Sequence, residues 1–254
     1  MKITLIGNGM MAKALAKGLI ESYSVEILGR DEEKLAKLKK LIPEIETKVI
    51  GDKEDITDKN IIFCVKPYAL QSVAVRLEGK ANLFVSILAG TKIESLKKHI
   101  SSKYYIRVMP NVAASLKKSM TTITGDREVK NLAMELFNSI GKTLWVNTEV
   151  QLDIATAVAG SGPAFLALVA EGIADGAVNA GLEREYSTYL VQGLFEGVAA
   201  LLEKNHPAVI KDSVSSPGGT TIAGAAMLEE KGVRSAMIKA VEEAHKRAVE
   251  ISKK

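Results

Sequence analysis

The stretch Leu5-Ile6-Gly7-Asn8-Gly9-Met10-Met11-Ala12 decides the fold of this chain. It follows a short apolar run directly and opens a helix expected over residues 12–20, which is the pattern GxGxxA of a dinucleotide-binding turn. Gly7 permits the tight turn, Gly9 lets the backbone approach a pyrophosphate, and the small Ala12 lets the helix pack close to the strand. In isolation the motif could be an ordinary glycine turn, but its place at the start of a βαβ series favours a nucleotide site.

Short β-branched runs alternate with charged amphipathic segments as far as about residue 147. This alternation is typical of βαβ units on a parallel sheet. Strands are expected at residues 2–7, 25–28, 60–65, 83–88, 105–108, 121–124 and 142–146. Residues 32–41 carry leucines on one face and lysines on the other, which predicts a helix lying on that sheet. The fold class is therefore α/β, with an N-terminal Rossmann domain of doubly wound, mainly parallel topology.

The remainder of the chain has the composition of an all-α domain. Helices are expected at residues 151–158, 164–180, 185–204, 221–230 and 234–252, with Gly181 and Gly232 as helix stops and Pro163 and Pro207 in first turns. The helix 164–180 is apolar on nearly all sides and must be buried on most of them. We expect a dinucleotide-binding domain at 1–149 and a helical substrate-binding domain at 150–254 that dimerises between subunits.

The composition argues against several classes of protein. Lysine and arginine total 34 against 30 acidic residues and are scattered, so we expect neither nucleic-acid nor membrane-surface binding. A single cysteine, Cys64, and three widely spaced histidines predict no disulfide and no metal site, as in a cytoplasmic protein. The N-terminus lacks the zones of a secretion signal, and the uncharged run 154–170 is interrupted by Gly160-Ser161-Gly162-Pro163, which disfavours a membrane span.

The second predicted strand ends at Gly29-Arg30, where an NAD enzyme would offer an acid to the ribose. A guanidinium there would pair with a 2′-phosphate, so we expect NADPH as cofactor, with NADH as the alternative because Asp31 is adjacent. Arg30 could also be a solvated loop cation, and Lys66 a surface lysine that starts a helix. Two further strands end at Cys64-Val65-Lys66-Pro67 and Ser86-Ile87-Leu88-Ala89-Gly90 and could lie along a dinucleotide. The expected cofactor contacts are Ile6, Gly7, Asn8, Gly9, Met10, Met11, Arg30, Cys64, Val65, Lys66, Pro67, Ile87, Leu88 and Ala89.

Two segments contain more glycine and hydroxyl than helix packing requires: Gly160-Ser161-Gly162-Pro163-Ala164 and Ser215-Ser216-Pro217-Gly218-Gly219-Thr220-Thr221. In the second, backbone N–H groups converge before a helix and could cradle a small carboxylate, although a helix N-cap after a Pro-Gly turn has the same pattern. Between Lys142 and Lys204 the sequence has no lysine that could act as the base of an alcohol dehydrogenase. An imine nitrogen can be protonated before reduction, so the sequence suits reduction of C=N better than C=O.

The chain resembles the Δ1-pyrroline-5-carboxylate reductase family over nearly its full length. The resemblance rests on the glycine fingerprint, Cys64-Val65-Lys66-Pro67, Arg107-Val108-Met109-Pro110-Asn111, the Gly160 segment and the run from His206-Pro207 to Thr221. It implies hydride transfer from NAD(P)H to L-Δ1-pyrroline-5-carboxylate, giving L-proline in the last step of proline biosynthesis. It also implies a homodimer through the C-terminal helices, and the sequence leaves open whether the dimers form a higher oligomer.

The resemblance assigns roles to the loop before the last two helices. The substrate carboxylate would lie on Ser216, Gly218, Gly219 and Thr220, and Thr221 would hydrogen-bond the ring nitrogen as the catalytic residue. The chain departs from the family's common residues at Met10, Asp52 and Glu183. None of these departures falls in the expected substrate loop.

Two other functions fit parts of the sequence. A β-hydroxyacid dehydrogenase would share the domain order, but it needs a catalytic lysine where this chain has Phe165 and Leu166. A non-enzymatic module that senses NADPH would account for Gly7 and the helices but not for the Gly-Gly-Thr-Thr segment.

Overall fold

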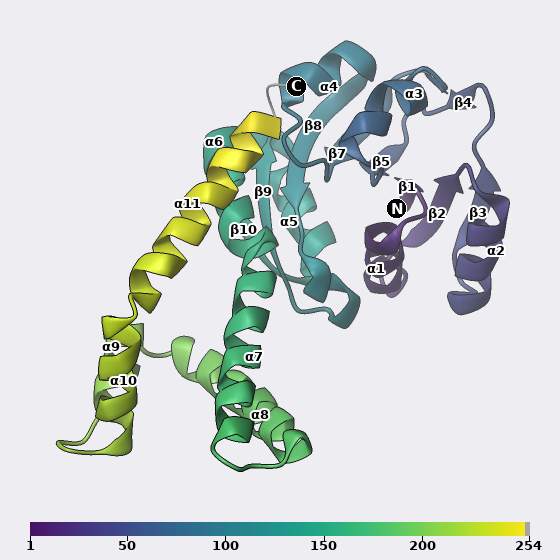
Figure 1. Cartoon of the computed structure of the whole chain (residues 1–254). Helices are drawn as coiled ribbons and strands as arrows, with labels where there is room; N and C mark the ends of the chain where they lie inside the picture. The colour runs from purple at the N-terminus through teal and green to yellow at the C-terminus, as the bar shows by residue number, and fades with distance from the viewer. Residues whose placement is uncertain (252–254) are drawn as a thin grey trace. The chain divides into compact units, whose positions relative to one another are not determined.

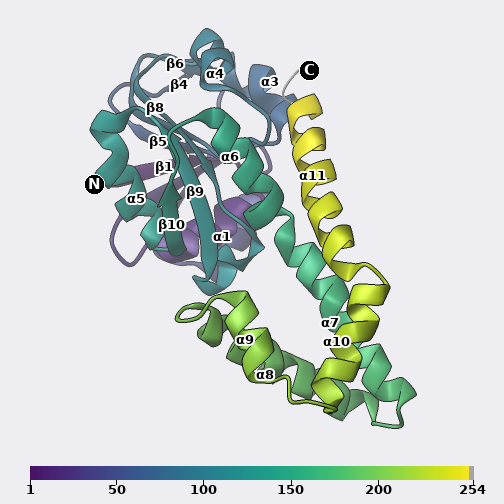
Figure 2. The ribbon, with the colours of Figure 1, turned by 90° about the vertical axis from the view of Figure 1, so that its left-hand side faces the viewer.

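The computed structural model describes residues 1–251, and their packing divides the chain into two compact units. The first comprises Met1–Ser161 and the chain from Ala244 on, and the second comprises Gly162–Glu243. Each unit is described by itself. Figure 1 labels the helices and strands, and Figure 2 shows the same ribbon from the side.

An eight-stranded sheet forms the centre of the first unit, in the order β10-β9-β8-β7-β5-β1-β2-β3. Its strands are β1 Lys2–Ile6, β2 Ser24–Gly29, β3 Glu46–Val49, β5 Asn60–Phe63, β7 Ala81–Ser86, β8 Ser102–Met109, β9 Ser119–Gly125 and β10 Gly141–Trp145. Every neighbouring pair is parallel except β8 with β9. The short strands β4 Glu54–Asp55 and β6 Leu77–Glu78 pair separately.

Helices cover both faces of this sheet. The helices are α1 Met10–Leu19, α2 Glu32–Leu41, α3 Leu70–Ala74, α4 Ile93–His99, α5 Lys130–Asn138 and α6 Glu149–Ala155. Side chains of α1, α2 and α5 pack into one apolar cluster and those of α3 and α4 into another. Successive residues of β5 contribute to both clusters: Ile62 belongs to the first, and Ile61 and Phe63 belong to the second. Alternate side chains of a strand point to opposite faces, so a strand buried on both sides is apolar throughout.

The second unit contains helices alone among its described residues. These are α7 Gly162–Asn179, α8 Arg184–Leu202, α9 Pro207–Ser213 and α10 Thr220–Glu230, followed by α11 Val233–Ile251, whose last turns belong to the first unit. Short helical turns complete the chain: η1 Pro67–Ala69, η2 Val112–Leu116, η3 Arg127–Val129 and the π-helical η4 Thr156–Gly160. Gly181 and Gly232 end α7 and α10 with φ of +105° and +71°, and Pro207 opens α9, as expected.

The predicted fold class is confirmed: a Rossmann domain with a mainly parallel sheet precedes an all-α region. All seven predicted strands are present. The polar edge strand β3 and the helices α3, α4 and α5 were not expected, because they are short or lack a long apolar period, and of α9 only the first-turn Pro207 was expected. The helix expected at 234–252 ends, as far as it is described, at Ile251, and its last predicted residue lies outside the described part.

The expectation that one subunit's helix 164–180 is buried on most sides is not met within a single chain. Leu168 is 70% exposed and Leu166 is 52% exposed on α7. Ala174 is the buried residue of this helix, and its carbonyl accepts a hydrogen bond of 2.7 Å from Ser187 Oγ on α8.

Within residues 1–251, one helical run, Glu149–Asn179, has the length and apolar composition that could cross a membrane, which by itself is weak evidence of a span.

Candidate functional site

A pocket of about 290 Å³ opens where the order of the strands reverses. From β1 the chain proceeds to β2 and β3 on one side, and β5, β7 and β8 follow on the other side. Ligands of doubly wound sheets bind beyond the carboxyl ends of the strands at such a switch point. The pocket has Ile6 at the end of β1 and Cys64 just after β5 in its wall, so it lies at this point.

The glycine turn of the pocket has the geometry that its sequence predicted. Gly7 has φ of +121°, and a Cβ there would lie 2.7 Å from the Cys64 carbonyl oxygen. Its N–H donates to the Leu28 carbonyl at 2.8 Å, which ties the turn to β2. Gly9 is the N-cap of α1, and a Cβ there would meet nothing within 4 Å. Gly7 is therefore required by the protein itself, whereas the space beside Gly9 is open to a ligand.

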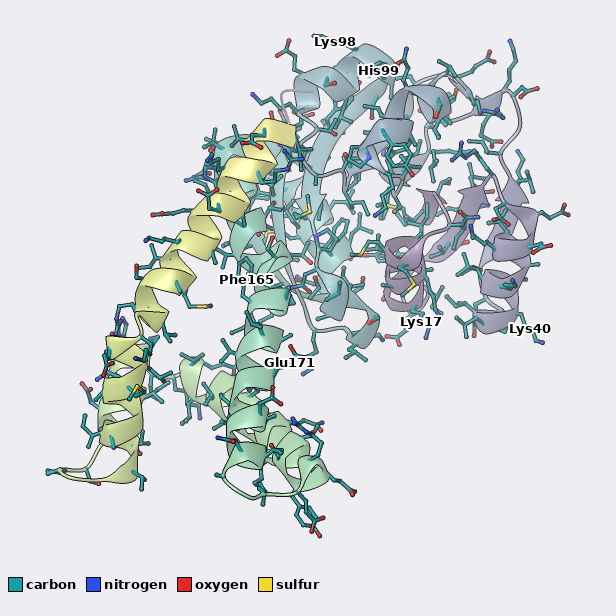
Figure 3. The ribbon with its side chains drawn as sticks, viewed as in Figure 1. Lys17, Lys40, Lys98, His99, Phe165 and Glu171 are labelled. Carbon is teal, nitrogen blue, oxygen red and sulfur yellow. The ribbon has the colours of Figure 1, made fainter. Side chains whose placement is uncertain are left out.

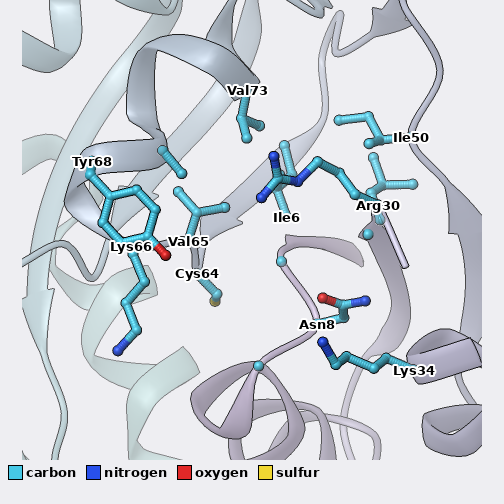
Figure 4. A pocket seen from close by; sticks show the side chains of 15 residues that line it. Ile6, Asn8, Arg30, Lys34, Ile50, Cys64, Val65, Lys66, Tyr68 and Val73 are labelled. Carbon is cyan, nitrogen blue, oxygen red and sulfur yellow. The ribbon is translucent and has the colours of Figure 1, made fainter. Parts of the chain in front are cut away.

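Basic residues dominate the charged lining of the pocket. Arg30, Lys34 and Lys66 line it, and within residues 1–251 no acidic residue does (Figure 4). Asn8 reaches between the strand ends, where its Nδ2 donates to the Asp31 carbonyl at 3.2 Å. An anionic ligand with an apolar portion fits this lining, since Ile50 and Val73 supply apolar surface beside Arg30.

Asp31, whose position next to Arg30 left NADH as the alternative cofactor, does not line this pocket. Its Oδ1 accepts the Lys34 N–H at 3.0 Å and caps α2, while Oδ2 lies 2.9 Å from Lys34 Nζ. The hydrogen bond from the Lys34 backbone, supported by its ammonium group, lowers the pKa of Asp31. Asp52, one of the departures from the family's common residues, is an exposed partner of Arg76 at 3.2 Å and also lies outside the pocket lining.

Eight of the fourteen expected cofactor residues line this pocket, namely Ile6, Gly7, Asn8, Gly9, Arg30, Cys64, Val65 and Lys66. Pro67 and Ala89 line a neighbouring pocket of about 570 Å³ between α3 and α4. Ile87 packs against the core, and Leu88 is buried, with its N–H bonded to Ser86 Oγ at 3.2 Å. Met10 is 82% exposed at the start of α1, and Met11 packs against the core.

The sequence reasoning missed several residues of the pocket. Lys34, Tyr68, Ile50, Val73, Leu28, Gly29 and Ala69 also line it. The position of Lys34 could have been inferred, because it stands four residues after Arg30 in the first turn of a helix and so lies near the same strand end. Cys64 is partly buried against the apolar core, and this burial raises the pKa of its thiol.

The expected substrate loop lies in the second unit and leads into α10. Ser216 accepts the Gly219 N–H at 3.0 Å through its carbonyl, Gly218 has φ of +68°, and Gly219 is the N-cap of α10. A Cβ on Gly219 would lie 2.5 Å from Ser216 Oγ, which can rotate away, and 3.1 Å from the Ser216 carbonyl oxygen, which is a tight contact. Thr220 and Thr221 are exposed in the first helical turn, where backbone N–H groups have no partner within the helix.

The Gly160 segment forms the transition from η4 to α7 and carries no lysine. Asn111 Nδ2 donates to the Ala159 carbonyl at 2.9 Å, which holds the π-helical turn against the end of β8. Phe165 and Glu171 follow on α7 (Figure 3). In residues 1–251 no group of three or more histidine, cysteine, aspartate or glutamate side chains is suited to hold a metal ion.

Comparison with known proteins identifies both halves of the chain. Residues 149–251 match the family model of pyrroline-5-carboxylate reductase dimerisation, and residues 2–90 match the model of NADP oxidoreductase, coenzyme F420-dependent. The pyrroline-5-carboxylate reductase of a Synechocystis species is 38% identical, with 100% of this chain and 99% of that protein covered.

Solved structures agree in fold over the whole chain. The structure of a pyrroline-5-carboxylate reductase from Coxiella burnetii has a TM-score of 0.86 and 28% identity, and the comparison covers 99% of this chain and 98% of that one. The crystal structure of the Plasmodium falciparum pyrroline carboxylate reductase with NADP bound has a TM-score of 0.82 and 25% identity, with the same coverage.

These similarities confirm the predicted oxidoreductase activity, small-molecule substrate and NADP-type cofactor, together with a dimerisation region in the helical half. The chain belongs to the pyrroline-5-carboxylate reductase family.

Proposed function

We propose that this protein reduces the C=N bond of L-Δ1-pyrroline-5-carboxylate to give L-proline, with NADPH as the physiological cofactor. One observation carries the proposal: the similarity to a pyrroline-5-carboxylate reductase extends over 100% of the chain, and so includes both the nucleotide pocket and the loop before α10. When bound, the nicotinamide supplies the hydride, so the protein needs no nucleophile of its own.

The cofactor contacts follow from the glycine turn. The free N–H groups in the first turn of α1, after Gly9, would hold the pyrophosphate, because a helix N-terminus favours an anion. Ile6, Asn8, Met10 and Met11 surround this turn in the sequence. Arg30 would hold the 2′-phosphate, and the strand ends at residues 64–67 and 87–89 would lie along the rest of the cofactor.

The substrate contacts are proposed on the loop before α10. The carboxylate would lie on the backbone of Ser216, Gly218 and Thr220, near the positive end of the helix dipole. Gly219 would act by its lack of a side chain, since its N–H already donates to Ser216. Thr221 would hydrogen-bond the ring nitrogen through its hydroxyl and orient the C=N bond for reduction, which makes Thr221 the proposed catalytic residue.

The assembly, cellular location and domain boundaries of the protein are also proposals. The exposed apolar residues of α7 and α8 support a homodimer through the helical region, and a higher oligomer of such dimers is the alternative. We place the protein in the cytoplasm, without a membrane span and without a nucleic-acid partner. The division into domains at 1–149 and 150–254 also remains a prediction, and the dimerisation model begins at residue 149.

The decisive experiment is to follow NADPH oxidation by its near-ultraviolet absorbance in the presence of pyrroline-5-carboxylate. A parallel reaction contains a 3-hydroxy acid and NADP⁺. Loss of absorbance with the imine, without reduction of NADP⁺ by the hydroxy acid, is the expected result. Turnover of the hydroxy acid alone would favour a β-hydroxyacid dehydrogenase, and turnover of neither would favour a module that only senses NADPH.

A further inference from the structure

Two cations lie at the end of the pocket where β2 leads into α2. Arg30 and Lys34 both line the pocket, and Figure 4 shows both side chains extending their charged ends toward it. Among the described residues Lys34 Nζ forms an ion pair with Asp31, at 2.9 Å, and the side chains of this ion pair are 64% and 41% exposed. An ion pair this exposed is weak because water screens both charges, so the Lys34 ammonium group can change partner at little cost.

The Asp31 carboxylate is directed at α2 and does not line the pocket. Both of its carboxylate oxygens face α2, one on the Lys34 N–H and the other on the Lys34 ammonium group. A ribose 2′-hydroxyl in this pocket would therefore find no carboxylate to accept its hydrogen bond, since no acid is in the lining. A 2′-phosphate would instead meet two cations near the N-terminus of a ten-residue helix.

We infer that Lys34 is a second specificity-determining residue for NADPH, which leaves Asp31 and pairs with the 2′-phosphate beside Arg30. The inference rests on the proposed function, because it assumes that the pocket holds the adenosine end of the cofactor. Asp31 acts as the competing anion: it holds Lys34 in place when no 2′-phosphate is bound. The backbone capping bond to Lys34 does not depend on the ammonium group, so α2 keeps its first turn during the exchange.

The test measures binding to the full-length protein by titration calorimetry, without any turnover. The probes are adenosine 2′,5′-bisphosphate and adenosine 5′-monophosphate, which differ only in the 2′-phosphate. Lys34→Ala should weaken the bisphosphate about tenfold, as expected for one charge-assisted hydrogen bond, and leave the monophosphate unchanged. Lys34→Arg should restore most of the loss.

Lys37→Ala is the matched control. Lys37 lies on the same exposed helix and its charge acts on Asp31, but it does not line the pocket. It should leave the affinity ratio of the two probes unchanged. Asp31→Asn keeps a capping side chain while removing the competing charge, and should tighten the bisphosphate selectively.

The outcomes separate this inference from the proposed function. Equal weakening of both probes by Lys34→Ala, or no weakening, would overturn the role of Lys34 while leaving the nucleotide pocket intact. Weaker binding of the bisphosphate to Asp31→Asn would overturn the exchange. If the unaltered protein bound neither probe, the nucleotide pocket and the inference would both be wrong.

Discussion

Arg107 on β8 and Asp153 on α6 form a buried ion pair, with 3.0 Å between Nη2 and Oδ1. The Arg107 side chain is 1% exposed, and its Nη1 also donates to Glu149 Oε1 at 2.9 Å. The same Glu149 oxygen accepts the Ile93 N–H at 2.9 Å. The network thus joins a central strand, the start of α4 and the helix that leads toward the Gly160 segment.

Arg107→Met should destabilise the protein by about 3–5 kcal/mol, because Asp153 would remain buried without a partner. Urea unfolding of the purified protein measures the change. The control is Arg184→Ala, which breaks the exposed pair with Asp175 and should cost less than about 1 kcal/mol. Equal effects of the two substitutions would contradict the structural role of the Arg107 network.

Gly7→Ala and Gly9→Ala should separate folding from cofactor binding. At Gly7 an added Cβ clashes with the Cys64 carbonyl at a positive φ, so the free energy of unfolding should fall by about 1–3 kcal/mol. At Gly9 the Cβ meets no protein atom, so stability should change by less than about 0.5 kcal/mol. NADPH affinity should nevertheless fall at least about tenfold in Gly9→Ala, which fluorescence titration would detect. Unchanged affinity in Gly9→Ala would remove Gly9 from the cofactor site.

Thr221→Ala should lower kcat by about a hundredfold, because the hydroxyl that orients the imine nitrogen is lost. Thr221→Ser should retain most of the turnover and Thr221→Val should not, although valine has nearly the shape of threonine. Steady-state rates of the three variants with pyrroline-5-carboxylate provide the measurement. Normal turnover by Thr221→Val would exclude Thr221 from the mechanism.

Glu54 should make stability depend on pH on the acid side. Burial by itself raises the pKa of this carboxyl group, but hydrogen bonds from Lys48 and Lys59 outweigh it and lower the pKa below 4.5. The ionised Glu54 therefore contributes its full stabilisation of the folded protein above pH 4.5, and this contribution is lost as the pH falls through the folded-state pKa. Unfolding free energies measured between about pH 3 and 7 should fall less steeply with acid in Glu54→Gln than in the unaltered protein. The exposed Glu44→Gln should retain the original slope, and an equal slope in Glu54→Gln would refute the assignment.

Leu168→Glu should weaken the dimer, because this residue is 70% exposed on α7 within one chain and lies in the dimerisation region. Sedimentation velocity at micromolar concentration should show a shift from dimer toward monomer. Val75→Glu places the same charge on a 72% exposed residue of the first unit and should leave the dimer intact. A dimer that persists in Leu168→Glu would place the interface elsewhere.

Much of the fold could be predicted because local patterns and packing agree. The apolar run at β5 has residues in both core clusters, so its continuous hydrophobicity indicated a strand covered on both faces. β3 escaped prediction because an edge strand such as Glu-Thr-Lys-Val can be polar and still pair with β2. In the site, Gly7 and Arg30 could be named from the motif and the strand end. Val73 could not, because it enters the pocket only through the packing of α3 on the sheet.

The sequence by itself determined seven strands of the sheet, the glycine turn and the family, because each depends on residues that are neighbours in the chain. Only the tertiary structure decided which charges face the nucleotide pocket. Asp31 and Arg30 are adjacent in sequence. The Asp31 carboxylate nevertheless bonds the backbone N–H and the ammonium group of Lys34, while the Arg30 guanidinium lines the pocket. That choice depends on where the first turn of α2 begins relative to the end of β2, and the spacing of residues alone does not contain it.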